Sequence, residues 1–186
     1  MQDEAHTLRS LTLFVSSHFI FNVLGKLQSE ILSGEKREAV STLTDYSKLL
    51  RQACSFGSKE TISLAEEKQF LETYLKLEKA RFGDKPFLCS IIGFDTEVVF
   101  IEPFIIQPFV ELALLGSLGY ENNTINVIFN AAQNSIRIES VMLNTEIHEK
   151  LAGKCEVAKQ RLNYFNYTYH ISETEPRYLQ KISLNP

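Results

Sequence analysis

The sequence predicts an α+β protein in which a helical hairpin precedes a layer of strands and helices. Two observations support this class. Apolar residues recur at helical spacing over roughly the first 54 positions, and short runs of β-branched and aromatic residues begin after residue 86. We therefore expect two domains, a helical hairpin over residues 1–60 and an α/β layer domain over residues 61–186.

The first predicted helix covers about residues 5–32. It ends at Ser33-Gly34, where glycine can adopt the left-handed conformation that stops a helix. A helix turns by about 100° per residue, so its apolar side chains fall on one seam. The members of this seam are Leu13, Ile20, Leu24, Leu27 and Ile31.

His18 lies on the far side of this helix from the seam. Asn22, Gly25 and Ser29 share its face within about 40° and form a small polar strip. A single histidine on an apolar helix is more often a packing residue than a functional one, so periodicity alone gives His18 no role. If the strip is exposed, it is suited to docking a partner.

The second predicted helix covers about residues 36–54 and runs antiparallel to the first, because the connection is short. Its apolar stripe consists of Ala39, Leu43, Tyr46, Leu50 and Ala53. Two such helices bury one seam and leave Phe19, Phe21 and Val23 uncovered. Pairing two hairpins into a four-helix bundle would cover these side chains, so we expect a homodimer.

Ser63-Leu64-Ala65-Glu66 has the pattern of a capping box and predicts a third helix that ends near Phe82. Residues 87–92 and 97–101 then predict two strands around a turn at residues 93–96. Residues 103–115 predict a buried helix with Pro108 near its first turn.

The last third of the chain predicts four more strands and part of a helix. Residues 124–129 and 135–141 alternate as a half-buried hairpin does. Residues 146–165 are helical in part, and residues 167–171 and 178–184 predict the final two strands. The region after the hairpin therefore contains about six strands and three helices.

Composition excludes several classes of function. The net charge is −4 and the basic residues are scattered, which gives no reason to expect nucleic-acid binding. Cys54, Cys89 and Cys155 are far apart without metal-ligand spacing, so we expect reduced, buried thiols and no metal. The apolar run over residues 11–25 is shorter than the roughly 20 residues that span a membrane. We expect a soluble, cytoplasmic protein without membrane insertion.

Four segments, in this order, resemble the histidine kinases of bacterial two-component systems, in the group that sits behind membrane sensors and partners LytTR-type response regulators. They are HFIFN from residue 18, LTDYSKLLRQA from residue 43, SLAEEKQFLETYLKLEKARFG from residue 63 and EPFIIQPFVELAL from residue 102. The resemblance covers roughly residues 8–118. It implies that the first two helices form a dimerisation and histidine-phosphotransfer hairpin and that the tail is similar to a Bergerat-type ATP-binding α/β sandwich.

By this resemblance His18 falls on the phosphoacceptor position, and Asn22, one turn later, would orient the imidazole ring or a phosphate oxygen. Neutral imidazole is a competent nucleophile because its ordinary pKa is about 6.5. A response-regulator receiver domain, for which the resemblance suggests the LytTR type, would dock across Asn22, Gly25 and Ser29. Where the family tends to have proline before the histidine, this chain has Ser17.

The resemblance also implies an eroded nucleotide site. Leu112 stands where the family has the asparagine that helps to hold Mg²⁺, and leucine offers no oxygen ligand to a hard cation. Residues 140–145 lack the aspartate and glycines of the adenine-binding box, and residues 152–154 keep a single glycine of the last box. Glu111, Glu78 and Arg81 match the family, but structural roles explain them equally well. We expect no cofactor, with ATP and Mg²⁺ binding lost.

The leading hypothesis is therefore a histidine phosphotransferase in which His18 exchanges phosphoryl groups with a response regulator. The alternative is a pseudokinase adaptor without catalysis, which dimerises with a partner kinase or sequesters a regulator. An active ATP-dependent kinase is the least favoured alternative. Without the Mg²⁺ ligand and the glycine boxes, most of the charge stabilisation of the transition state would be absent.

Overall fold

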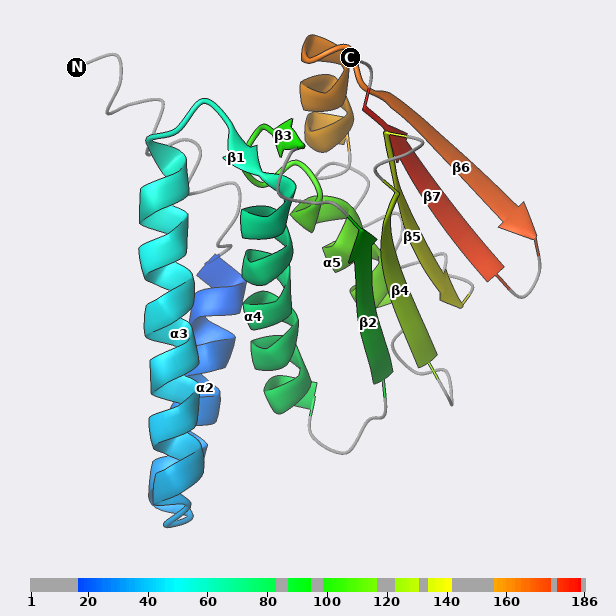
Figure 1. Ribbon diagram of the computed structural model, residues 1–186. Coiled ribbons are helices and arrows are strands. Elements are labelled where there is room, and N and C mark those ends of the chain that lie inside the picture. The colour runs from blue at the N-terminus through cyan, green and yellow to red at the C-terminus, as the bar shows by residue number, and fades with distance from the viewer. Residues whose placement is uncertain are drawn as a thin grey trace.

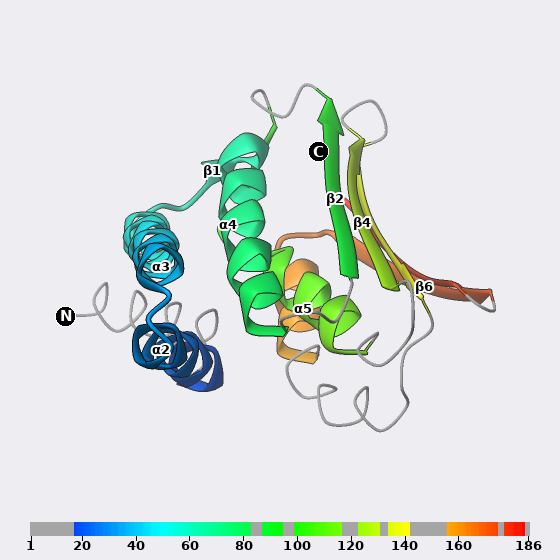
Figure 2. The same ribbon diagram turned by 90° about the horizontal axis from the view of Figure 1, so that it is seen from below.

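The computed structural model describes residues 17–82, 87–94, 99–116, 123–130, 134–141, 156–174 and 177–184. Helices occupy one side of the molecule and a twisted sheet the other, as Figures 1 and 2 show from two directions. This arrangement confirms the α+β class. Over the described residues, no helix combines the length and apolar character needed to cross a membrane.

The first two described helices form the expected hairpin (Figure 1). They are α2 (Ser17–Leu32) and α3 (Lys36–Gly57). The turn between them contains Gly34 at a φ of 79°, and the Glu35 N–H donates to the Glu30 carbonyl at 2.8 Å. The left-handed glycine ends α2 where the sequence predicts it. The part of the first predicted helix before residue 17 lies outside the described residues.

Helix α4 (Leu64–Phe82) begins with the predicted capping box. The Ser63 N–H donates to Glu66 Oε2 at 2.8 Å, and the Glu66 N–H donates to Ser63 Oγ at 3.1 Å. Two backbone donors that have no partner inside the helix are thereby satisfied. Lys59 adds an ion pair to Glu66 at 2.8 Å.

The main sheet has five strands in the order β2-β4-β5-β7-β6. Their bounds are β2 (Phe87–Phe94), β4 (Asn123–Asn130), β5 (Ser135–Val141), β6 (Thr168–Thr174) and β7 (Arg177–Ser183). β4 with β5 forms an antiparallel pair, which confirms the predicted hairpin, and the two predicted final strands, β6 and β7, also pair antiparallel. Among the strands that the structure describes, β2 alone pairs in parallel, with β4.

We expected residues 87–92 and 97–101 to form two strands around a common turn. The structure instead pairs these two strands with other partners. Phe87 of β2 is in register with Asn123 of β4. The following strand, β3 (Phe100–Ile101), instead pairs with β1 (Ile62–Ser63), with Ile101 opposite Ile62. β1 leads directly into α4. The pairing of β3 with β1 therefore places the segment that follows β3 beside the start of α4.

Helix α5 (Gln107–Gly116) begins four residues later than the predicted helix over residues 103–115. Phe104 has a φ of 61°, a left-handed conformation that is incompatible with an α-helix and produces a turn over residues 103–106. Pro108 is the second residue of α5, so its predicted place near the first turn is confirmed. A further helical segment covers residues 156–164.

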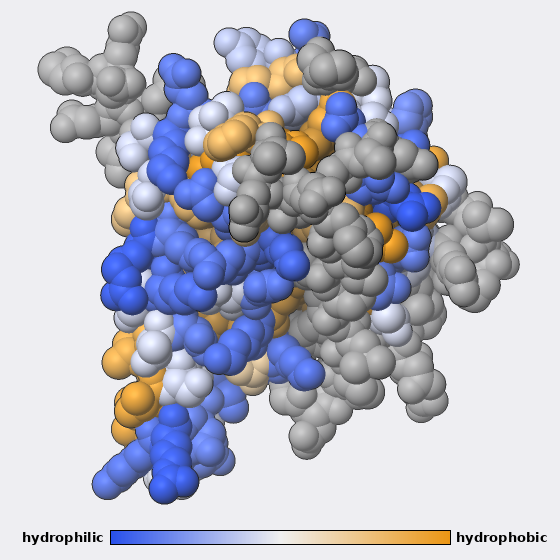
Figure 3. All heavy atoms as spheres, in the orientation of Figure 1, coloured by the Kyte–Doolittle hydropathy of each residue, from blue (hydrophilic) through white to orange (hydrophobic). Residues whose placement is uncertain are grey.

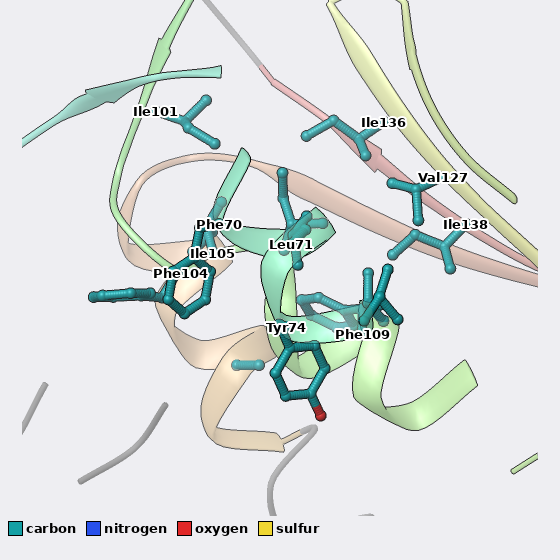
Figure 4. Packing of buried hydrophobic residues seen from close by; sticks show 14 of the residues in the cluster. Phe70, Leu71, Tyr74, Ile101, Phe104, Ile105, Phe109, Val127, Ile136 and Ile138 are labelled. Atoms are coloured by element: carbon teal, nitrogen blue, oxygen red, sulfur yellow. The ribbon is translucent and has the colours of Figure 1, made fainter. Parts of the chain in front are cut away.

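One continuous apolar core joins the helices to the inner face of the sheet. Figure 4 shows Phe70 and Tyr74 of α4 and Phe109 of α5 gathered opposite strand residues that include Val127 and Ile138. The same core continues into the hairpin. The predicted domain boundary at residue 60 therefore remains a prediction.

The cysteine prediction was wrong for Cys54. Its thiol is free, as expected, but the residue is exposed on α3. The side chains of Cys89 and Cys155 lie outside the described residues.

Candidate functional site

His18 lies in the first turn of α2, directly after Ser17. Its side chain is outside the described residues, as is that of Ser17. The backbone therefore gives its position in the fold: near the amino end of a helix that packs on α3 and α4 (Figure 2).

The predicted docking strip is accessible along α2. Gly25 and Ser29 are exposed, and Asn22 is half-buried. An added Cβ atom at Gly25 would meet no heavy atom within 4 Å. The strip thus offers a small, open surface that begins one helical turn after His18.

The buried face of α2 carries Phe19 and Val23 rather than the predicted seam. Phe19 stacks on Tyr74 of α4, with ring centroids 5.2 Å apart and an interplanar angle of 28°. The expectation that Phe19 and Val23 are uncovered in one chain was therefore wrong, because α4 packs on the hairpin and covers them. Phe21 is 71% exposed, as expected.

Of the predicted apolar seam, Leu24 and Ile31 are exposed, Ile20 and Leu27 are half-buried, and Leu13 lies outside the described residues. The exposed members and their neighbours form what we call the outer apolar face of the hairpin: Leu24, Ile31, Leu32, Val40, Leu43 and Leu50. Figure 3 shows apolar atoms gathered along this edge of the molecule, over the hairpin. Of the stripe predicted on α3, Ala39, Tyr46 and Ala53 are buried. Packing against α4 buries these three side chains, whereas Leu43 and Leu50 of the same stripe stay exposed.

Polar contacts also hold the hairpin to α4. Lys76 of α4 forms an ion pair with Asp45 of α3 at 2.7 Å, and Gln52 donates to Gln69 at 3.2 Å. The sequence patterns did not identify these contacts, since each joins residues that lie far apart along the chain. These two contacts help to fix the position of α3 relative to α4, in addition to the apolar packing between the helices.

A polar cluster lies where α4 meets α5. Arg81 Nε donates to Glu78 Oε2 at 2.8 Å, and Gln107 Nε2 donates to Glu111 Oε2 at 3.4 Å. The Gln107 side chain also lies beside the Tyr74 hydroxyl. Burial, aided by the Glu111 and Glu78 carboxylates, raises the pKa of Tyr74 well above its ordinary value. Figure 4 shows this hydroxyl pointing away from the apolar cluster.

This cluster brings together the three residues that match the family in sequence, Glu78, Arg81 and Glu111, and adds Tyr74 to them. Tyr74 has no local sequence signal beyond its place in an apolar stripe. Its ring contacts the residue after His18, and its hydroxyl contacts the helix that carries Glu111. Tyr74 thus joins α2 to α5 through α4.

The structure describes Leu112, which stands where the resemblance expects a magnesium ligand. Leu112 is 2% exposed, so its side chain is packed in the core and presents no oxygen atom. Residues 142–145 and 152–154 lie outside the described residues. Within the described part of the chain, no group of three or more histidine, cysteine or acidic side chains could hold a metal ion.

Comparison with known proteins identifies relatives over most of the chain. Residues 6–86 match the family model for histidine kinase. The Sensor protein LytS of Staphylococcus haemolyticus is 32% identical over 123 residues, which are 65% of this chain and 21% of that protein. The LytS of Enterococcus faecalis is 27% identical over 163 residues, 83% of this chain and 27% of that protein. The Sensor histidine kinase YpdA of Escherichia coli is 34% identical over 111 residues, 58% of this chain and 19% of that protein. The chain thus spans between 19% and 27% of the length of these relatives.

Two solved structures share the fold along nearly the whole chain. A bacterial phosphotransferase solved at 1.7 Å has a TM-score of 0.52 at 10% identity and covers 98% of this chain and 96% of its own. The histidine kinase domain of a blue-light activated kinase from Erythrobacter litoralis has a TM-score of 0.54 at 8% identity, with coverages of 97% and 93%. At these identities the likeness concerns the fold alone.

Proposed function

This chain belongs to the histidine kinase family of two-component systems, in the group of the LytS sensor proteins, and on that premise we propose that it is a histidine phosphotransferase. His18 is the phosphoacceptor in this proposal. The partner is the receiver domain of a response regulator, for which LytTR-type regulators are the first candidates.

The accessible strip on α2 carries this proposal. A receiver can approach along Gly25 and Ser29 because both are exposed and no heavy atom stands where a side chain at Gly25 would lie. Phosphoryl transfer requires mainly positioning and charge stabilisation of the migrating group. The P–O bond to the receiver aspartate breaks while a P–N bond to the His18 imidazole forms. Asn22, one turn on, orients the ring or a phosphate oxygen.

The burial of Leu112 supports a phosphoryl source other than a nucleotide bound to this chain. Mg²⁺ requires oxygen ligands, and a leucine side chain packed in the core supplies none. Without the metal the charge on the transferring phosphate lacks its principal stabiliser. A phosphorylated receiver carries its own activated phosphoryl group, so this chain needs no ATP.

The outer apolar face of the hairpin supports a homodimer. Six exposed leucine, isoleucine and valine side chains lie on two adjacent helices, and large exposed apolar surfaces usually mark interfaces. A second hairpin packed on this face gives a four-helix bundle. The docking strip remains free where Leu24 and Ile31 form the interface, because helical periodicity places the strip on the other side of α2 from these two residues.

The same outer apolar face favours a second candidate function. It could pair with the hairpin of a related active kinase as well as with a second copy, since hairpins of one family share their apolar spacing. The chain would then act as an adaptor that dimerises with a kinase or sequesters a regulator. In this function His18 carries no phosphoryl group.

Phosphotransfer from a labelled receiver separates the two functions. A LytTR-type response regulator is charged with labelled acetyl phosphate, freed of donor and mixed with wild-type protein, with His18→Ala, or with His170→Ala. His170 is an exposed histidine on β6, so its variant is a matched control. We expect label on the wild type and on His170→Ala, and none on His18→Ala. Equal labelling of all three, or of none, would exclude His18 as the acceptor from that receiver.

A further inference from the structure

The carboxyl end of α2 is held to α3 by polar contacts. Thr42 Oγ1 of α3 donates to Glu30 Oε1 at 3.2 Å, and Lys26 forms an ion pair with the same oxygen at 3.5 Å. The Glu30 side chain is buried, so this carboxyl group lies enclosed between the two helices. The Glu35 N–H then closes the turn by its hydrogen bond to the Glu30 carbonyl. Helix α2 is therefore fixed to α3 near residue 30.

The amino end of α2 is held by an aromatic contact with α4. Figure 1 shows α2 inclined so that this end lies beside α4, whereas its other end continues into the turn before α3. The rings of Phe19 and Tyr74 are both buried and stack with centroids 5.2 Å apart. Phe19 directly follows His18, so this contact lies one residue from the proposed phosphoacceptor.

Tyr74 is itself fixed relative to α3, independently of α2. One turn before it, the Phe70 ring packs on the Phe56 ring of α3 with centroids 6.0 Å apart. Two residues after it, Lys76 forms the 2.7 Å ion pair with Asp45 of α3. Helices α3 and α4 thus form one support, and α2 is attached to it at both ends.

A small tilt of α2 would move His18 by a distance that matters for phosphoryl transfer. Residues 19 and 30 are about 16 Å apart along the helix axis, at 1.5 Å per residue. With the end at residue 30 fixed, a tilt of about 4° displaces the other end by about 1 Å. A misplacement of about 1 Å can slow a reaction by about 100-fold.

We propose that Tyr74 is a positioning residue for phosphoryl transfer at His18. Its ring fixes the amino end of α2 through Phe19 and so places the imidazole for attack on the phosphoryl group of a docked receiver. One imidazole nitrogen attacks with its lone pair, the other keeps its proton, and the receiver aspartate leaves as a carboxylate. This inference rests on the proposed function and adds a residue outside the docking strip that controls the rate of transfer.

Docking of the receiver should depend much less on this contact. Ser29 lies beside the end of α2 that α3 holds, and Gly25 lies about halfway along the helix. Loss of the ring contact therefore displaces the strip less than it displaces His18. Tyr74 should affect the maximal rate of transfer and not the affinity for the receiver.

Single-turnover transfer separates these two quantities. A LytTR-type response regulator carrying labelled phosphate and freed of donor is mixed with an excess of the full chain at increasing concentrations. We expect Tyr74→Leu to lower the maximal rate by about tenfold or more and to change the half-saturating concentration by less than about twofold. Tyr74→Phe keeps the ring and loses only the hydroxyl, which lies beside Gln107, so it should transfer at the wild-type rate.

Phe129→Leu is the matched control, because it also replaces a buried aromatic residue by leucine but lies on β4 of the sheet. It should lose stability in urea unfolding and keep the wild-type maximal rate. An equal fall in the maximal rate of Phe129→Leu, a wild-type rate in Tyr74→Leu, or a change confined to the half-saturating concentration would overturn the inference alone. A wild type that takes no label would overturn the proposed function and this inference with it.

A second variant keeps the inference testable if Tyr74→Leu does not fold. Phe19→Leu removes the other ring of the pair and should lower the maximal rate to a similar extent. A wild-type maximal rate in Phe19→Leu would overturn the inference. Where both single variants fold, the double variant should be no slower than the slower of the two, because both changes act through one contact. Losses that multiply would contradict this role of the ring pair.

Discussion

The ring of Phe19 lies stacked on the ring of Tyr74, with centroids 5.2 Å apart. Phe19 directly follows His18, and Tyr74 stands in the middle of α4 with its hydroxyl in the polar cluster that includes Glu111. This contact fixes the amino end of α2 to the rest of the molecule. The helix that carries His18 is thereby placed by α4 as well as by its hairpin partner.

Removal of this contact should destabilise the protein. Phe19→Ala deletes a buried aromatic ring, and such changes cost about 3 kcal/mol or more. Phe21→Ala deletes the same ring at an exposed position of the same helix and should change stability by less than about 0.5 kcal/mol. Urea unfolding followed by circular dichroism measures both. Equal losses for the two variants would contradict the packing described for α2.

The outer apolar face should control the oligomeric state. Leu24→Glu places a charge in the apolar surface, which desolvation in an interface would strongly disfavour. We expect the wild type to be a dimer and Leu24→Glu a folded monomer in light scattering after size exclusion. Ser41→Glu adds the same charge to an exposed position on the other side of α3 and should remain dimeric. A wild type that is monomeric at high concentration would refute the four-helix bundle.

The capping box at the start of α4 should contribute measurably to stability. Ser63→Ala removes the hydroxyl that accepts the Glu66 N–H and should cost about 1 kcal/mol. The exposed Ser41→Ala is the control and should be nearly neutral. Because α4 packs on the hairpin and on the sheet, thermal melting of the whole chain reports the loss. A neutral Ser63→Ala would mean that other contacts determine where α4 begins.

The hairpin turn and the start of α4 could be predicted from sequence because their signals are local. Gly34 ends α2, and Ser63 with Glu66 begins α4 within four residues. The pairing of β2 with β4 could not be predicted, because strand partners are chosen by residues far apart in the chain. The same limit applies to burial on α2. The spacing of apolar residues identifies a seam, but contact with Tyr74 decides that Phe19 is the side chain that is buried.

The candidate site, like the fold, could be predicted from the sequence only in part. Helical spacing places Asn22, Gly25 and Ser29 on one face, and all three are at least partly accessible. Glu66 and Glu67 are adjacent and chemically identical, yet one caps its own helix and the other caps α5. No local pattern distinguishes them, since the turn that Glu67 binds is 37 residues away.

Restoring an asparagine at Leu112 should not restore nucleotide binding. Leu112→Asn buries an amide in place of an apolar side chain and should cost about 3 kcal/mol of stability. The sequence contains no glycine-rich box to hold the phosphates, so calorimetric titration with Mg-ATP should give no heat of binding for the variant. Micromolar binding by Leu112→Asn would show that one residue accounts for the loss.

The most direct test of the proposed function is to measure phosphate on His18 by mass spectrometry after two separate incubations. One contains Mg-ATP alone, and the other contains a phosphorylated receiver domain alone. We predict phosphohistidine at His18 with the receiver as donor and none with Mg-ATP. Phosphate on His18 with Mg-ATP alone would make the chain an active kinase and contradict the account, and an unmodified His18 in both incubations would leave the adaptor function.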